Sequence, residues 1–166
     1  VAQIDFGVAK ARIAGELVDD HCLVVTFPHS NMRYVTSLPG ENAECLCHGL
    51  VEVFEHIGGV PPVIVMDNAT GAGRRNARGE VTPAAVLDVF DIKKSLSHKG
   101  NPYDNAVVES TNRPLKKELV YRNHYTTIEQ LRHDLNDYVW WSDNQRLHST
   151  LGYRSPKEFT EQGLVL

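Results

Sequence analysis

The sequence lacks any long hydrophobic run. No stretch approaches the roughly 18 apolar residues of a membrane span, and no charged and apolar leader precedes a small-residue cleavage site. Cysteine is scarce as well: only Cys22, Cys45 and Cys47 are present, and their spacing fits no disulfide framework. We therefore expect a soluble, cytoplasmic protein with no membrane partner and no disulfide.

An excess of positive charge is also missing. The formal net charge is −4, which argues against a protein whose affinity for nucleic acid rests on Lys and Arg. The distribution changes this view, because residues 74–124 hold ten bases against six acids, while the segments on either side are acidic. Two interpretations of the basic segment stay open: a surface that binds phosphates, or an ordinary solvated basic face.

The length of 166 residues and the hydrophobic content of 42% fit one domain with a proper core. The sequence shows no internal repeat. It begins at Val1, already inside an alternating apolar run. We expect it to be a piece of a longer protein, with flanking domains missing.

Three strands open the predicted fold. Residues 1–8 alternate apolar and polar side chains, so that Asp5 points away from Ile4 and Phe6, and residues 21–27 and 33–38 are rich in β-branched residues. Turn residues separate these runs, at 14–16 and 28–31. An antiparallel meander is therefore expected.

A helix–strand alternation follows. A helix capped near Asn42 is predicted to end at Ile57 before a glycine pair, and residues 63–66 form a short buried strand that ends at Asp67. A second helix over 82–90 and a strand over 92–96 come after a flexible basic loop at 71–79. A last long helix, capped by Thr126 or Thr127, is expected to reach Gln145.

The segment 95–119 leads from a turn-rich loop into a helix that starts near Asn105, after Asp104 as its cap. Its polar face has a single carboxylate, Glu109, among amides and bases; the other polar residues of this face are Asn105, Asn112, Arg113 and Lys116. Such a face suits metal and phosphate, although a solvated amphipathic helix is the plainer interpretation. Pro114 is expected to kink or restart the helix.

The order of elements predicts an α/β protein of ribonuclease H-like fold, with a mixed five-stranded sheet and helices on both faces. In this fold, acids at neighbouring strand ends and on an adjacent helix come together. Asp5, Asp67 and Glu109 occupy these three kinds of place.

Two further patterns have simpler explanations. Cys45, Cys47 and His48 invite a zinc hypothesis, but residues two apart on a helix point to different sides, so packed cysteines are favoured. The pair Trp140-Trp141 is interpreted as core or subunit contact rather than as a base-stacking platform.

The sequence resembles the retroviral-integrase-like DDE transposases of bacterial insertion sequences, over nearly its whole length. Residues 1–91, with AQIDFG, PHSNMRYV and GGVPPVIVMDNATGAGRR, resemble the catalytic domain of IstA-type transposases. Residues 95–166, with SLSHKGNPYDNAVVES, LKKEL and DNQRLHSTLGYRSPKEF, resemble OrfB-type transposases. The departures are a long interval between Asp67 and Glu109, Pro114 in the helix, and Asp143 where an aromatic residue is usual.

The resemblance implies that residues 1–166 are an integrase-type catalytic core, a fragment of a longer transposase without its N-terminal DNA-binding region. It also implies that Asp5, Asp67 and Glu109 are catalytic metal ligands. Two Mg²⁺ or Mn²⁺ ions per active site would serve strand cleavage at transposon ends and strand transfer. The resemblance also implies that Lys116 binds transposon-end DNA, with Asn112, Arg113 and Lys117 as further phosphate contacts. His148, Tyr153 and Pro156 match a tail motif with an expected structural role.

The resemblance further implies DNA as the partner, both transposon ends and target, a homodimer or higher oligomer, and an AAA+ ATPase helper of the kind that IstA-type systems use. The location would be the bacterial cytoplasm, at the nucleoid. Two other functions stay open: a catalytically impaired hybrid remnant that acts only as a DNA-binding or self-association module, and a structure-selective nuclease on the same fold. The intact acidic triplet favours the enzyme, and the tail motifs disfavour the nuclease.

Overall fold

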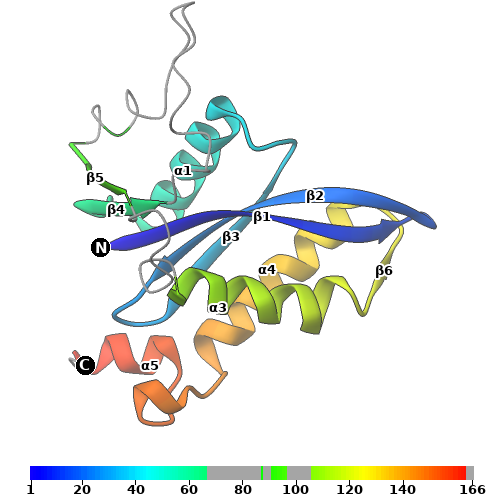
Figure 1. Ribbon diagram of the computed structural model, residues 1–166. Helices are drawn as coiled ribbons and strands as arrows, with labels where there is room; N and C mark the ends of the chain where they lie inside the picture. Colours follow the sequence, from blue (N-terminus) through cyan, green and yellow to red (C-terminus); the bar gives the residue numbers. More distant parts are fainter. Residues whose placement is uncertain (67–86, 88–90, 97–105, 164–166) are drawn as a thin grey trace, which may run out of the picture.

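A mixed β-sheet forms the centre of the computed structural model, which describes residues 1–66, 87, 91–96 and 106–163. The strand order is β3-β2-β1-β4-β5 (Figure 1). The strands are β1 (Ala2–Ile13), β2 (Glu16–Phe27), β3 (Met32–Leu38), β4 (Val63–Met66) and β5 (Lys93–Leu96). The first three are antiparallel, whereas β4 and β5 run parallel to β1. The predicted five strands and their mixed sheet are confirmed.

The hairpin of β1 and β2 is longer than predicted. It extends to a turn at Ala14 and Gly15, both of which have positive φ, 50° and 88°. The prediction ended β1 at Val8 because the next apolar residues are small: Ala9 and Ala11 are buried between exposed Lys10 and Arg12. A sixth strand, β6 (His124–Tyr125), pairs with the far end of β1 and was missed because it has only two residues.

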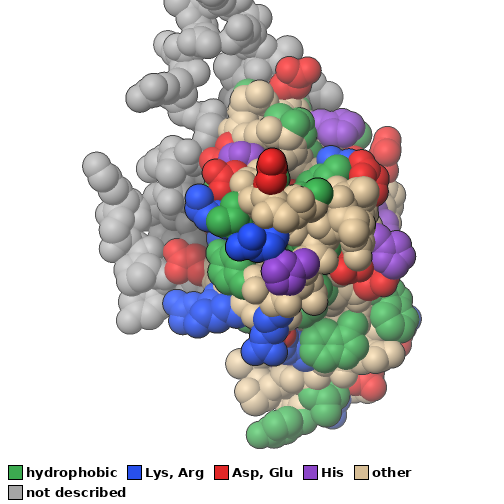
Figure 2. Space-filling model, turned by 90° about the vertical axis from the view of Figure 1, so that its right-hand side faces the viewer, with side chains coloured by type: hydrophobic (Ala, Val, Ile, Leu, Met, Phe, Trp, Pro, Cys, Tyr) green, Lys and Arg blue, Asp and Glu red, His purple; other side chains and the backbone are tan. Residues whose placement is uncertain are grey.

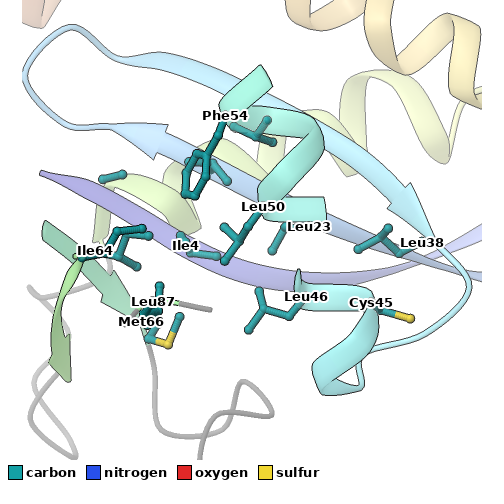
Figure 3. Packing of buried hydrophobic residues seen from close by; sticks show 14 residues of the cluster. Ile4, Leu23, Leu38, Cys45, Leu46, Leu50, Phe54, Ile64, Met66 and Leu87 are labelled. Atoms are coloured by element: carbon teal, nitrogen blue, oxygen red, sulfur yellow. The ribbon is translucent and has the colours of Figure 1, made fainter. Parts of the chain in front are cut away.

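One face of the sheet is covered by α1 (Ala43–Ile57). As predicted, Asn42 caps this helix, because its side chain accepts from the amide of Cys45, and Gly58 ends it in the left-handed conformation. Leu46 and Leu50 point from α1 into a core with Ile4 and Leu23 of the strands (Figure 3).

The other face is covered by α3 (Ala106–Pro114), η1 (Leu115–Val120) and α4 (Ile128–Asn144) (Figure 1). Val108, Leu115 and Leu131 pack there against Val24 of β2. Thr127 caps α4 through its hydroxyl oxygen, as predicted. Helices therefore lie on both faces, and alternate residues of β1 supply the two cores.

Pro114 changes the helix without ending it. The α-helical part stops at this residue, and the chain continues as a π-helix, with the amide of Tyr121 donating to the carbonyl of Lys116 at 2.9 Å. Proline removes one amide donor and crowds the preceding turn, which explains why the wider helix begins here. The predicted irregularity at Pro114 is confirmed.

The C-terminal segment closes the fold with η2 (Ser149–Leu151) and α5 (Pro156–Glu161). Ser155 and Glu158 form a reciprocal capping box at the start of α5. The amide of Asn31, in the turn before β3, donates to the hydroxyl of Thr150 at 3.2 Å. This contact, from the side-chain amide of Asn31, joins the turn between β2 and β3 to the C-terminal segment.

Several predicted elements lie outside the described residues. These are the basic loop 71–79, the helix 82–90 apart from the buried core residue Leu87, and the loop 97–105 with its cap Asp104. In the described part of the chain, no helix has the length and apolar character needed to cross a membrane.

Candidate active site

Strand β1 and helix α3 lie side by side, and the distance between successive contacts is similar along both. The amide of Val108 donates to Oε1 of Gln3 at 3.2 Å, and the side-chain amide of Asn112 donates to Oδ2 of Asp5 at 2.7 Å. Four helical residues advance about 6 Å and two strand residues about 6.6 Å. The same face of β1 therefore meets successive turns of the helix.

Asp5 points toward α3, on the face opposite Ile4, as the alternation predicts. Its partner Asn112 is only 7% exposed and Asp5 is half-buried, so the bond is partly shielded from water. Oδ1 of Asn112 is buried and has no hydrogen-bond partner among the described residues. Asn112 thus faces the sheet rather than solvent, and its position favours holding the Asp5 carboxylate over contacting DNA directly.

Lys116 lies one turn further along, above Gly7. A methyl group at Gly7 would lie 3.5 Å from Nζ of Lys116 and 3.5 Å from Oδ1 of Asn112. The missing side chain of Gly7 therefore leaves room for the lysine beside β1. The positive charge of Lys116 also reaches Cys22, the partner of Gly7 on β2, although burial raises the pKa of this thiol above its ordinary value.

Glu109, Arg113 and Lys117 are exposed. Glu109 precedes Asn112 by about one turn of α3. Asp67 lies outside the described residues, immediately after β4, whose Met66 pairs with Ile4 next to Asp5. The structure thus joins the helix of Glu109 to Asp5 through Asn112.

Sequence reasoning missed Gln3 and Gly7, which share the face of Asp5. Gln3 supplies an acceptor to a main-chain amide in the first turn of α3, where amides lack partners within the helix. The alternation along β1 could have identified them, since every second residue of the strand faces the helix. The partners on the helix follow only from the packing.

The described residues include Asp5 and Glu109, two of the three predicted metal ligands. Among residues 1–66, 87, 91–96 and 106–163, no group of three or more His, Cys, Asp or Glu side chains is placed to hold a metal ion. The two described acids offer hard oxygen donors, which fit Mg²⁺ or Mn²⁺. Cys22 and Cys45 pack in different cores, on opposite faces of the sheet, which explains why they form no common zinc site.

A second polar cluster ties β3 to the end of α4. The main-chain amide of Arg33 donates to Oδ2 of Asp143 at 3.0 Å, and Nε of Arg33 lies 3.4 Å from Oδ1. Both side chains are buried. Burial lowers the pKa of the Arg33 guanidinium. Burial also raises the pKa of Asp143 to about 7, although the hydrogen bond from the main chain of Arg33 and its positive charge act to lower the pKa of this carboxyl.

A neighbouring network fixes η1 to α4. Arg146 donates to both carboxylate oxygens of Glu118, at 2.8 and 3.1 Å, and Tyr138 donates to the same carboxylate at 2.7 Å. The bonds from Arg146 hold the pKa of Glu118 below its usual value, against desolvation. Arg146 also lies over the ring of Trp141, 5.6 Å from its centroid.

The tail residues have different surroundings. Trp140 is 58% exposed and Trp141 40%, which contradicts a core position and leaves subunit contact open. Pro156 is buried as the first residue of α5, and His148 bridges to Arg154 through main-chain bonds, so both have structural surroundings. Tyr153 is exposed, with a positive φ of 58°.

Parts of the chain are similar to known proteins. Residues 90–156 match the family model of the integrase core domain. The transposase of insertion sequence element IS904 from Lactococcus lactis is 41% identical over 99 residues, which cover 59% of this chain and 38% of the relative. The putative transposase InsK of IS150 from Escherichia coli is 34% identical over 77 residues, 46% of this chain and 27% of the relative. The chain thus spans less than two fifths of the length of these relatives.

Solved structures show the same fold. A chain of the simian T-cell lymphotropic virus intasome in complex with the PP2A regulatory subunit B56 gamma matches with a TM-score of 0.76 at 17% identity, over 95% of this chain and 52% of that chain. The catalytic core domain of BIV integrase matches with a TM-score of 0.69 at 18% identity, over 98% and 94%.

The fold and the site geometry define the class: this domain has a ribonuclease H-like fold. Its first strand carries the carboxylate of Asp5, which accepts a hydrogen bond from Asn112 on the helix that follows the fifth strand. Within that class, residues 90–156 match the integrase core domain, and part of the chain is similar to transposases of insertion sequences. The division into IstA-like and OrfB-like halves, and the expected ATPase helper, stay predictions.

Proposed function

We propose that this chain is the catalytic core of a transposase that cleaves DNA strands and transfers them in a metal-dependent reaction. The observation that carries the proposal is the bond from Asn112 to Asp5, because it joins β1 to the helix of Glu109. Similarity to transposases of insertion sequences supports the same activity. The impaired-remnant alternative gains no support from these relatives.

Asp5, Glu109 and Asp67 would hold Mg²⁺ or Mn²⁺, with two ions per site. When bound, the metal supplies an activated water or hydroxyl and stabilises the leaving oxygen of an in-line displacement. The protein's own contribution is orientation: Asn112 holds one oxygen of Asp5, and Gln3 holds the start of the helix that carries Glu109. Carboxylates held in this way lose little freedom when they bind a cation.

Phosphate contacts would come from the same helix. Lys116 lies beside Gly7, one turn beyond Asn112, whereas Arg113 and Lys117 are exposed. Their positive charges would attract the DNA backbone and fix its register without reading its sequence. The DNA partner, transposon ends and target, belongs to this proposal.

Self-association is proposed as well, as a homodimer or a higher oligomer. The two exposed tryptophans of α4 are large apolar side chains in contact with water, which supports their role as a subunit contact. One of the structural relatives comes from an assembled intasome.

The deciding experiment measures nicking of supercoiled plasmid by the purified chain with and without Mn²⁺. We expect nicks only with the metal, and a loss of at least about a hundredfold in Glu109→Gln, because an amide is a poor ligand for a hard cation. The matched control is Glu55→Gln, an exposed carboxylate on α1. Equal activity in Glu109→Gln and the wild type would refute the assignment of Glu109.

Binding of Mn²⁺, measured by calorimetry, separates this function from the remnant alternative. Asp5→Asn should weaken the binding while the far-ultraviolet circular dichroism stays unchanged. A folded chain that binds DNA but neither binds Mn²⁺ nor nicks would favour the remnant.

A further inference from the structure

The far end of the β1–β2 hairpin forms a pocket together with the end of η1. Its volume is about 340 Å³ and its lining includes Lys10, Arg12, Leu17, Tyr121 and His124. We call it the hairpin pocket. It lies away from Asp5, at the opposite end of β1, and none of its residues takes part in the site described above.

The strand register explains why the cations gather there. Arg12 pairs with Leu17 on β2 and with His124 on β6. Paired residues share a face, and so do residues two apart along one strand. Lys10, Arg12, Leu17 and His124 are therefore on one face. Figure 2 views this end of the molecule and shows Lys and Arg side chains next to a His, with acidic side chains alongside.

The charges of the pocket are available to a ligand. Lys10 lies 3.5 Å from Asp19, but both side chains are more than half exposed, at 70% and 53%, so this ion pair contributes little and opens easily. Arg12 donates only to the carbonyl of Gly15 in the turn among the bonds of the described residues. Two cations and a histidine thus face solvent at the rim.

The pocket also exposes apolar surface. Tyr121 is 57% exposed and Leu17 63%. A tyrosine in this position can donate its hydroxyl to a phosphate and place its ring against a sugar. Exposed cations next to an exposed tyrosine match the chemistry of a nucleic-acid backbone better than that of a small anion.

The pocket continues the helix of the candidate active site. Twelve residues separate Glu109 from Tyr121 along α3 and η1, which is about 18 Å at 1.5 Å per residue. One DNA strand covers that distance in about five nucleotides at 3.4 Å each. A duplex placed at Glu109 and running along this helix would pass the exposed Lys117 and reach Tyr121 at the pocket. Lys10 and Arg12 lie beyond Tyr121, on the face of β1 opposite Asp5.

We propose that the hairpin pocket binds the backbone phosphates of duplex DNA, about five nucleotides from the bond held at Glu109. The proposal rests on the proposed function for its position relative to the chemistry, but binding at the pocket needs no catalysis. The pocket would add affinity and orientation and leave the reacting bond to the other end of the helix.

The test uses fluorescence anisotropy with a labelled duplex of about 30 base pairs and arbitrary sequence, in EDTA, from about 50 to 200 mM KCl. Removing both cations in Lys10→Ala/Arg12→Ala should reduce the slope of log K against log salt by about 1.8 and the affinity by about tenfold or more. Tyr121→Ala should weaken binding without changing the slope. The matched control is Arg132→Ala/Lys157→Ala, which removes two exposed cations of α4 and α5.

The proposal is overturned if the pocket double variant and the control double variant bind alike, or if the wild type does not bind the duplex at the lowest salt concentration. Binding of an acidic protein in place of DNA at this pocket would also overturn it. The outcome is separable from that of the proposed function: a pocket that binds DNA in a chain that never nicks contradicts only the function. An unchanged salt slope in a chain that nicks contradicts only the pocket.

Discussion

At the scale of single residues, Asn112 has the most informative position. A buried amide costs free energy unless it is hydrogen-bonded, and its partner here is the carboxylate of Asp5, 107 residues away in the sequence. The neutral donor orients this carboxylate without neutralising it. A lysine at position 112 would also donate, but its charge would compete with a cation for Asp5.

Two substitutions of Asn112 should have different effects on metal binding. Asn112→Ala removes the donor, so we expect Mn²⁺ affinity to fall about tenfold or more, as for other residues that orient a ligand. Asn112→Asp places a second carboxylate against Asp5, which raises the pKa of one of the two acids and moves the pH profile of nicking to higher pH. Calorimetry and nicking rates at several pH values measure the two effects.

Asn136→Ala is the control, because Asn136 is an exposed amide on α4. A merely structural role of Asn112 would lower stability but leave the pH profile of the folded protein in place. An unshifted profile in Asn112→Asp would therefore exclude the positioning role.

At the scale of elements, close packing of α1 on the sheet depends on Gly49. A Cβ atom there would lie 2.7 Å from Cδ2 of Leu23, 3.0 Å from Cδ1 of Leu38 and 3.2 Å from Cγ2 of Thr36. All three atoms belong to strands of the sheet, and Leu23 is fully buried. The glycine thus sets how near the helix can approach.

We expect Gly49→Ala to destabilise the protein by about 1–3 kcal/mol, because extra volume in a packed core forces neighbours to shift. This exceeds the gain of about 1 kcal/mol or less from replacing glycine inside a helix. Gly59→Ala is the matched control, since a Cβ atom there meets nothing within 4 Å. Urea unfolding measures both; equal stability of the two variants would show that α1 moves outward without cost.

The elements also show what could be predicted from the sequence. Helix α1 has strong local signals, an Asn cap and a closing glycine, and both of its ends were predicted to within one residue. Strand β6 has two residues and exists only because the chain after η1 returns to β1. Pro114 predicts an irregularity in the helix but does not predict that it is a π-helix. The π-helical form depends on Leu115 and Val120 staying buried.

The candidate site was predictable in its residue types and only partly in its geometry. Alternation placed Asp5 on the face opposite Ile4, and this is what the structure shows. Helical periodicity grouped Asn112 with Arg113 on a polar face, yet Asn112 is buried and Arg113 exposed. The period of 3.6 residues fixes which residues are neighbours on a helix but not which side meets the sheet.

At the scale of the whole molecule, contacts join residues 1–91 to residues 95–166. Asp5 bonds to Asn112, Asn31 to Thr150, and Arg33 to Asp143. The last pair is buried between β3 and α4, and breaking such a pair leaves an uncompensated charge in the interior. The two parts of the chain therefore depend on each other for stability.

The Asp143 pair should make the stability of the whole protein depend on pH. Burial raises the pKa of Asp143 to about 7 in the folded chain, whereas an unfolded chain has a value of about 3.9. Between these values the folded protein holds a proton that the unfolded chain has released. The contribution of Asp143 to the free energy of unfolding therefore falls as the pH rises from about 4 to 7, and it changes no further above that range.

Comparing the wild type with Asp143→Asn isolates this effect. The free energy of unfolding of the wild type minus that of the variant should fall by roughly 2–4 kcal/mol between about pH 4 and 7. Asp137→Asn, an exposed acid on the same helix, is the control and should give a nearly constant difference. A constant difference for Asp143→Asn as well would mean that Arg33 keeps the carboxylate ionised throughout, and that attraction within the buried pair outweighs the cost of burying its charge.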